Sequence, residues 1–430
     1  MDKNLEEYCS TVDQKLPTAK TEGTRLILKN LTSGLTVAFI ALPLALAFGI
    51  GSGLGAQAGL VTAILAGIVA AIFGGSKYQV SGPTGAMTVI LIPIVAAYGP
   101  AAILQVGLMS SGFLVLAGIL KLGRHIHKLP TALIEGFTAG IAIVIAMQQI
   151  TFILGVKLVA SDHIWHSVFE EVRIWFQSPD PLPLVVGIAA IALNLFGTRK
   201  FPNLPVALAT VVGFTLIANV FGLKLDRIGN LPNQFNPPTI DFLSDGNWLA
   251  LLPPALAVAF LAGLESLLSA KIADKLANSE HHNPDRELIG QGLANLVVPF
   301  FGGVPATAAL ARTAVNIRSG ASSRLSAISH GVFLFLFVIF LGPLIGEIPL
   351  SALGGVLVAT AYHMVRPREL VTTAQTSKLD GMVLVITLVA TVALDLISAL
   401  ALGLVIYLAL RKTRVSRRTP KIDELETFGD

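Results

Sequence analysis

Two short breaks in a hydrophobic chain combine residue types that can bind an anion. The first break is Ser81–Ala86 (SGPTGA) and the second is Gly303–Ala309 (GVPATAA), and in each a Thr follows a Pro within two residues. Small residues then open a short apolar helix, whose first backbone N–H groups have no partner inside the helix. Two such helix starts that face each other would form a positive site for a small anion.

The residues of these breaks suit close contact between backbone and anion. Gly85, Ala308 and Ala309 have small side chains, so a ligand can reach the main chain, and Thr84 adds a hydroxyl donor. Arg312 follows the second break by about one turn; it either adds positive charge to the site or marks the cytoplasmic end of a short helix. An ordinary Pro/Gly turn would explain one break alone, and the matched pair favours a binding site.

Glu265 is the candidate for coupling to a cation. It lies in the apolar segment AGLESLLS, where a carboxylate is costly and therefore functional by default. It can carry a proton or coordinate sodium, and Ser269 falls one helical turn later on the same face. The alternative is a structural carboxylate paired with an interior cation or hydroxyl. The histidines form no metal-ligand pattern, and no nucleotide-binding or hydrolase motif is present, so we expect neither an enzyme nor a cofactor.

The composition is that of an integral membrane protein. Of 430 residues, 53% are hydrophobic and 13% are charged, whereas soluble domains carry about 25% charged residues. The net charge of +4 comes from Lys and Arg in the loops, as expected for cytoplasmic loops, and does not indicate nucleic-acid binding. Cys9 is the only cysteine, which excludes an intramolecular disulfide.

The hydropathy pattern predicts an all-α fold with fourteen membrane segments in two sets of seven. The first set is 27–52, 56–75, 84–98, 101–121, 130–154, 181–199 and 204–222, and the second is 250–271, 286–301, 307–319, 323–346, 350–365, 379–396 and 397–411. The third segment of each set is too short to cross a bilayer alone. We therefore expect two half-helices that meet at the midplane. The stretch 161–177 is predicted to be an amphipathic helix at the membrane surface.

With both termini in the cytoplasm, the loops on the inside are rich in Lys and Arg and the loops on the outside are rich in Asp and Glu. We therefore expect a protein of the cell's inner (plasma) membrane with both termini in the cytoplasm. An odd number of segments per half inverts the second half, which is the repeat architecture of secondary transporters. The expected organisation is a cytoplasmic segment at 1–24, a transporter domain at 25–412 with repeats at about 25–222 and 248–412, and a cytoplasmic tail at 413–430.

Several motifs in order resemble the SulP (sulfate permease) anion transporter family. They are Val37–Gly49, Val80–Gly85, His282–Gly292, Gly303–Pro305 and Ala311–Ala321, and the resemblance extends over almost the whole chain. It is strongest to the bicarbonate transporters of cyanobacteria within that family. It implies a core domain of segments one to four and eight to eleven, a gate domain of the rest, elevator-like movement and a homodimer in lipid.

The resemblance also implies roles for individual residues. Phe48, Thr84, Ala308, Ala309 and Arg312 would lie at or beside the anion pocket, and Glu265 would take the place of the coupling carboxylate.

Three positions depart from the sodium-dependent bicarbonate members: Glu265 stands for Asp, Ser269 for Thr, and Leu310 for a Thr that helps hold sodium. Loss of an oxygen ligand weakens a site for a hard cation, which favours a proton over sodium. Most members continue into a cytoplasmic STAS domain, and this chain is either a truncated or a natural short form.

The sequence therefore predicts a secondary-active transporter of bicarbonate or sulfate, coupled to a proton or to sodium. The alternatives on the same fold are an anion channel, an anion exchanger and a C4-dicarboxylate/proton symporter. A nucleobase/proton symporter is less suited, because Ala308 and Ala309 offer no side-chain hydrogen bonds to an aromatic ring.

Overall fold

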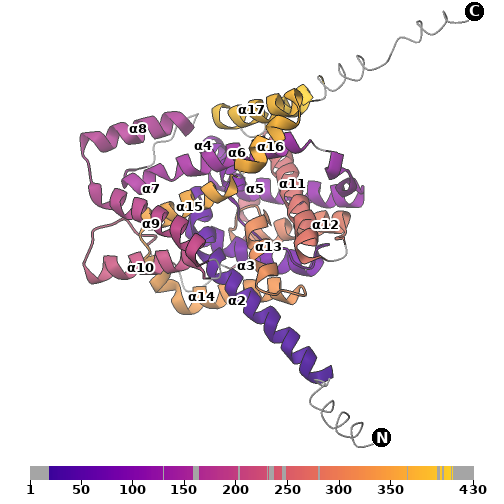
Figure 1. Cartoon of the computed structure of the whole chain (residues 1–430), viewed down its shortest axis with the longest axis horizontal. Coiled ribbons are helices and arrows are strands. Elements are labelled where there is room, and N and C mark those ends of the chain that lie inside the picture. The colour runs from indigo at the N-terminus through magenta and orange to yellow at the C-terminus, as the bar shows by residue number, and fades with distance from the viewer. Residues whose placement is uncertain are drawn as a thin grey trace, which may run out of the picture.

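The computed structural model is almost entirely helical (Figure 1). It describes residues 19–409 except 129, 158–163, 202–203, 230, 232–236, 245–247, 279–280, 366, 395–397, 400 and 408. The helices of the first half are α2 (Ala19–Gly51), α3 (Ala56–Phe73), α4 (Gly85–Tyr98), α5 (Pro100–Ile119), α6 (Thr131–Gln148), α7 (Ile150–Leu154), α8 (Ile164–Gln177), α9 (Pro181–Lys200) and α10 (Val206–Val220), with a 3-10 turn η1 (Leu122–Lys128).

The second half repeats this order. Its helices are α11 (Leu252–Ala277), α12 (Pro284–Val297), α13 (Leu310–Arg318), α14 (Leu325–Gly346), α15 (Leu350–Met364), α16 (Pro367–Thr376) and α17 (Lys378–Ala393), with 3-10 turns η2 (Asp241–Leu243) and η3 (Val298–Phe301). Residues 401–407 are also helical. Each predicted segment overlaps a helix within the described residues, and α8 matches the described part of the predicted amphipathic stretch. The predicted last segment, 397–411, lies only partly within the described residues, and the predicted tail 413–430 and residues 1–18 lie outside them. The short helix α16 was not predicted; it occupies the same place in the second half as α8 does in the first.

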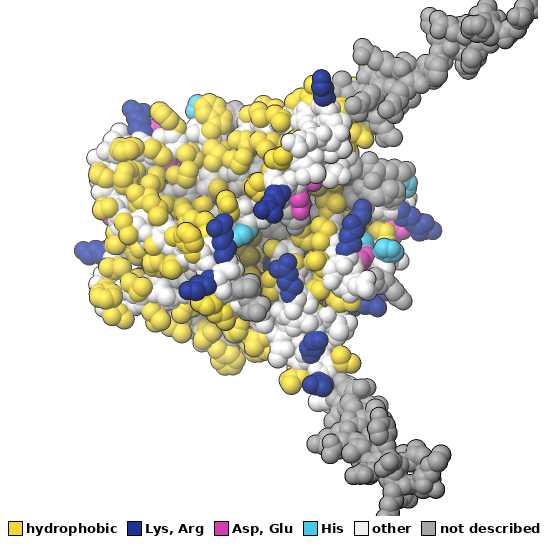
Figure 2. All heavy atoms as spheres, in the orientation of Figure 1, with side chains coloured by type: hydrophobic (Ala, Val, Ile, Leu, Met, Phe, Trp, Pro, Cys, Tyr) yellow, Lys and Arg dark blue, Asp and Glu magenta, His cyan; other side chains and the backbone are white. Residues whose placement is uncertain are grey.

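The lengths and surfaces of these helices fit a bilayer. Among the described residues, 7 helices are long and apolar enough to cross a membrane, and α4 and α10 are shorter apolar helices. Large hydrophobic side chains on α9 and α10 point outward, among them Phe196 and Val220. Figure 2 shows hydrophobic side chains covering much of the face over these helices. Such a surface is stable in lipid, where apolar side chains need no burial in protein.

The helix packing follows the inverted repeat. In one group α12 packs on α5 as α14 packs on α3, and α11 packs on α5 as α14 packs on α2. In the other group α17 packs on α6 as α15 packs on α9. In each case the equivalent helices of the two halves have exchanged places. The core group contains α2–α5 and α11–α14, and the gate group contains the remaining helices of both halves.

The two sequence breaks meet in a small antiparallel sheet inside the core group. Strand β1 (Ser81–Gly82) pairs with β2 (Thr307–Ala308), with Ser81 opposite Ala308 and Gly82 opposite Thr307. The amide of Ala309 also donates to the carbonyl of Val80 at 3.1 Å. Because the strands are antiparallel and only two residues long, α4 and α13 start on opposite sides of the pair and run apart. The predicted half-helices therefore begin next to each other.

Candidate functional site

Thr84 is the N-cap of α4 and opens the first helix start. Its backbone is extended and its hydroxyl accepts a hydrogen bond from the Met87 amide. The distance is 3.4 Å, long for such a bond. The amides of Gly85 and Ala86 precede the first intrahelical bond, which the Thr88 amide makes to the Thr84 carbonyl. These two amides and the positive helix end provide donors for an anion.

The Thr84 hydroxyl also reaches the candidate coupling residue. It donates to Oε2 of Glu265 on α11 at 3.1 Å. Glu265 is half-buried, whereas Thr84 is buried. The contact joins α4 of the first repeat to α11 of the second. A threonine hydroxyl has one hydrogen to donate, so this hydrogen serves either the carboxylate or another acceptor at the helix start.

Arg312 lies inside the protein, on the first break. Its side chain is 2% exposed, and Nη2 donates to the Pro83 carbonyl at 3.0 Å. Nη1 has no hydrogen-bond partner within the described part of the chain. A Cβ on Gly82 would lie 2.5 Å from Nη1, so a glycine there makes room for the guanidinium. Arg312 and Glu265 therefore contact neighbouring residues of the first break, Pro83 and Thr84, and they interact electrostatically.

The start of α13 is built differently. Its N-cap is Ala309, which makes no side-chain cap bond, and the first intrahelical bond runs from the Thr313 amide to the Ala309 carbonyl. The amides of Leu310 and Ala311 precede that bond and remain available as donors. Ala308 is buried and Ala309 half-buried. This start therefore offers an anion the backbone, with no hydroxyl comparable to that of Thr84.

Thr307 and Ser269 hold the scaffold together. The Thr307 hydroxyl donates to the Ala262 carbonyl at 3.0 Å and lies 3.0 Å from the Ser266 hydroxyl. It is fully buried, so it is not a free donor for an anion. The Ser269 hydroxyl is directed at Thr313 Oγ1, 3.4 Å away. Ser269 thus lies on the expected helix, and its hydroxyl bond goes to α13.

Phe48 borders the first helix start from α2. A Cβ on Gly85 would lie 3.1 Å from its Cε1 atom, which places the ring beside the first turn of α4. The Phe48 carbonyl accepts a hydrogen bond from the Thr88 hydroxyl at 3.3 Å. Phe48, Thr84 and Gly85 therefore lie together at one helix start, and Ala308, Ala309 and Arg312 approach it from the second break. All six remain predicted anion-site residues.

Three polar residues of α12 bond the two breaks and the turn that follows α3, and sequence reasoning missed them. Glu287 accepts from the amides of Gly75 and Ser76 at 2.8 and 3.0 Å. Gln291 donates to Ser81 Oγ at 2.8 Å. Asn295 bonds both the amide and the carbonyl of Ala306, at 2.8 and 2.9 Å.

These three side chains are almost completely buried. Their spacing of four places them on one helix face, and buried polar residues in a membrane helix are rare. Polar residues repeated every four positions in this predicted membrane segment could therefore have been recognised from the sequence as a buried hydrogen-bonding face.

An inverted-repeat membrane fold with two opposed half-helix starts beside a carboxylate defines a membrane transporter for anions. The chain belongs to the sulfate permease family, whose sequence model matches residues 27–414. It is 36% identical to the putative sulfate transporter YvdB of Bacillus subtilis, over 93% of this chain and 76% of that protein. It is 31% identical to the bicarbonate transporter BicA of Picosynechococcus, over 94% of this chain and 73% of that protein.

Solved structures agree with this assignment. The transmembrane domain of a cyanobacterial bicarbonate transporter BicA superposes with a TM-score of 0.80 at 30% identity, covering 87% of this chain and 97% of that domain. The murine anion transporter Slc26a9 in its inward-facing state shares the fold, with a TM-score of 0.81 at 15% identity over 95% of this chain and 75% of that one. The relatives are named as transporters, and the protein is an anion transporter rather than an enzyme.

Proposed function

We propose that the protein is a secondary-active transporter that moves a small inorganic anion, bicarbonate or sulfate, together with a proton. The observation that carries this proposal is the hydrogen bond from Thr84 to Glu265 at the start of α4, 3.1 Å long. It joins the best side-chain donor of the anion site to the group suited to bind a cation. An anion and a cation bound on either side of one hydroxyl would partly neutralise each other before crossing the membrane.

The coupling follows from the number of hydrogens on Thr84. With Glu265 ionised, the hydroxyl donates to the carboxylate and is unavailable to an anion. With Glu265 protonated, the carboxyl no longer competes as strongly, because hydrogen bonds to charged groups are the stronger ones. The Thr84 hydrogen is then free to turn toward an anion at the α4 amides. Proton binding thereby raises anion affinity, and by linkage anion binding raises proton affinity.

The same contacts support a proton over sodium. A hard cation needs several oxygen ligands. Leu310 supplies no side-chain oxygen, and the Ser269 hydroxyl is 3.4 Å from Thr313 Oγ1. One carboxylate and one hydroxyl suffice for a proton. We further propose an elevator-type movement of the core group against the gate group, a homodimer in the plasma membrane, and both chain ends in the cytoplasm, as the loop charges favour.

Uptake into proteoliposomes tests the proposal. An inward proton gradient should drive accumulation of labelled bicarbonate or sulfate, up to about tenfold per pH unit for each coupled proton. Glu265→Gln should lose this accumulation while still exchanging labelled for unlabelled anion across the membrane. Glu170→Gln on the surface helix α8, where the side chain is 43% exposed, is the matched control and should behave as wild type.

Two results would contradict the proposal. Accumulation driven by sodium and not by protons would show that Glu265 holds sodium despite Leu310. Proton-driven accumulation that survives Glu265→Gln would remove Glu265 from the coupling.

A further inference from the structure

The first helix start is closed on one side by a side chain from the gate group. A Cβ on Gly85 would overlap Cδ1 of Ile145 and lie 2.8 Å from its Cγ1 atom. Real Cβ atoms do not approach so closely, so any side chain at position 85 would force Ile145 out of its present place. Gly85 does not have a positive φ. The reason for a glycine at position 85 is therefore the lack of room for a side chain, because Ile145 occupies the place where a Cβ would lie.

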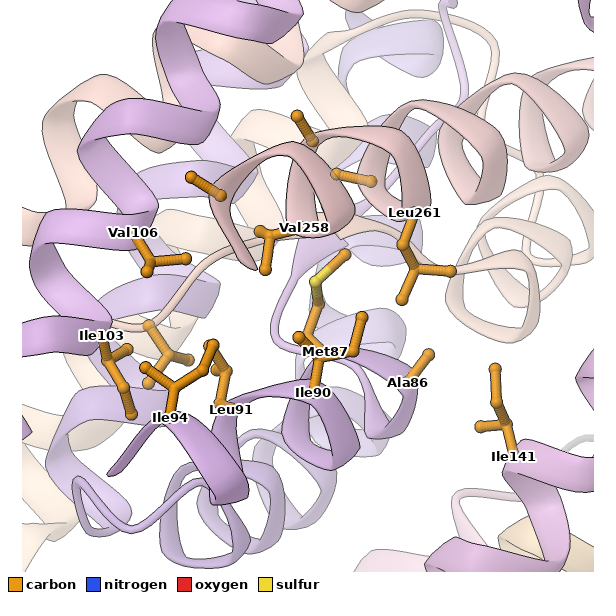
Figure 3. Packing of buried hydrophobic residues seen from close by; sticks show 14 of the residues in the cluster. Ala86, Met87, Ile90, Leu91, Ile94, Ile103, Val106, Ile141, Val258 and Leu261 are labelled. Carbon is orange, nitrogen blue, oxygen red and sulfur yellow. The ribbon is translucent and has the colours of Figure 1, made fainter. Parts of the chain in front are cut away.

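Ile145 belongs to an apolar stripe that faces the site. Phe137, Ile141 and Ile145 are spaced four apart on α6, which places them on one face of the helix, and all three are buried. Figure 3 shows Ile141 extending from α6 toward the first turn of α4, where Ala86 lies. Ile143 on the same helix is 38% exposed and points elsewhere. The stripe thus packs against the anion-binding turn, and Ile145 is its member beside Gly85.

We propose that Ile145 is a specificity-determining residue that limits the size of the transported anion. This inference rests on the proposed anion site at the α4 amides. An ion held by the Gly85 and Ala86 amides would contact the branched alkyl end of Ile145 on one side and the Phe48 ring on another. Neither side chain can hydrogen-bond a further oxygen. A compact ion with all its oxygens near the helix start fits, whereas a second carboxylate on a carbon chain would displace Ile145 or remain unpaired against it.

Competition against uptake tests the size limit. The labelled anion is whichever of bicarbonate and sulfate the wild-type protein accumulates, and the competitor is succinate, a C4-dicarboxylate. The measured ratio is the potency of succinate as a competitor divided by that of the unlabelled substrate. Ile145→Ala should raise this ratio by about tenfold or more, because one carbon in a hydrophobic pocket changes the selection between ligands by at least about that factor. Ile143→Ala, the same change on the exposed face of α6, should leave the ratio as in wild type. An unchanged ratio in a transporting Ile145→Ala protein would overturn the inference.

A second pair of variants keeps the test decisive if Ile145→Ala fails to fold. Ile145→Val removes one carbon and should shift the ratio in the same direction by a smaller factor. Gly85→Ala adds the overlapping Cβ and should abolish uptake, and the double variant Gly85→Ala/Ile145→Val should recover part of it, because the two changes compensate. No recovery together with an unchanged succinate ratio in Ile145→Val would overturn the inference.

The two proposals fail in different ways. If Thr84→Val leaves anion affinity as in wild type at acidic pH, where Glu265 is protonated, the anion site itself is misplaced. If Thr84→Val weakens affinity and the Ile145 variants keep the wild-type succinate ratio, the site stands and only the role of Ile145 is wrong.

Discussion

Replacing Thr84 by Val should uncouple anion binding from pH. The wild-type hydroxyl donates to Glu265 Oε2 at 3.1 Å, and a hydrogen bond to a charged group contributes about 1.5–3 kcal/mol. An anion that needs this donor must break that bond when Glu265 is ionised but not when it is protonated. At 1.4 kcal/mol per tenfold, wild-type affinity should be about 10- to 100-fold higher at acidic than at alkaline pH. In Thr84→Val the shared hydrogen is gone, and the ratio should approach one.

The variant also removes the acceptor for the Met87 amide. That cap bond is 3.4 Å long, so its loss should cost about 0.5 kcal/mol, the low end for an N-cap. Glu265 also loses its donor, which adds about 1.5–3 kcal/mol when the carboxylate is ionised. The sum is below the stability of about 5–15 kcal/mol that is typical of folded proteins, so a loss of coupling can be measured in folded material. Affinity is measured by calorimetry with sulfate at acidic and alkaline pH, because sulfate keeps its charge over this range whereas bicarbonate titrates.

Two comparison variants separate the hydroxyl from the rest of the side chain. Thr84→Ser keeps the hydroxyl and should keep the pH dependence. Thr88→Val removes a buried hydroxyl one turn later that donates to the carbonyls of Thr84 and Phe48 at 3.1 and 3.3 Å, and it should also keep it. A wild-type pH ratio in Thr84→Val, or a ratio near one in Thr84→Ser, would refute the shared-hydrogen reasoning.

Two further predictions concern the scaffold. Asn295→Leu leaves the amide and carbonyl of Ala306 without their partner, so we expect a loss of about 2–6 kcal/mol, at about 1–3 kcal/mol for each unsatisfied group. Thermal unfolding in detergent measures this loss, and a shift no larger than that of Asn219→Leu in an exposed position would contradict it. Arg124→Ala breaks an ion pair to Asp285 at 2.8 Å, but the arginine side chain is 61% exposed. We therefore expect the free energy of unfolding to change by less than about 1 kcal/mol. A larger change in the same assay would contradict this and would show that the pair holds η1 against α12.

The membrane segments were predictable because length and hydropathy decide them. Segments such as 56–75 and 181–199 correspond to α3 and α9 within two residues at each end. Bilayer thickness imposes the length, and the need to satisfy backbone groups imposes the helix. The proximity of the breaks was also predictable, since the odd number of segments per half fixes the inversion and matching positions then meet. The β1–β2 pairing confirms that expectation.

Side-chain partners were less accessible to sequence reasoning. Each break has a threonine shortly after its proline, Thr84 and Thr307, and their types alone suggest similar roles. Thr84 is the N-cap of α4, whereas Thr307 lies in β2, two residues before the N-cap of α13. The structure separates them: the Thr84 hydroxyl donates to a carboxylate, and the Thr307 hydroxyl donates to the Ala262 carbonyl. Which partner a hydroxyl finds depends on how each break packs against α11, which carries both Glu265 and Ala262. That packing joins segments far apart in the sequence and is not encoded in the local pattern.

In the proposed mechanism, this asymmetry is what lets a symmetric fold couple an anion to a proton. Both helix starts offer backbone amides and a positive helix end, so either could hold one side of an anion. Among the described residues, the N-cap hydroxyl of α4 donates to Glu265, whereas the N-cap of α13 is Ala309 and makes no side-chain cap bond. In the proposed mechanism, protonation of Glu265 therefore frees a hydroxyl donor on the α4 side of the anion, whereas the N-cap of α13 has no hydroxyl to free. An anion held between the two starts would bind weakly through α13 alone and tightly only after the proton releases Thr84, so the two ions load together.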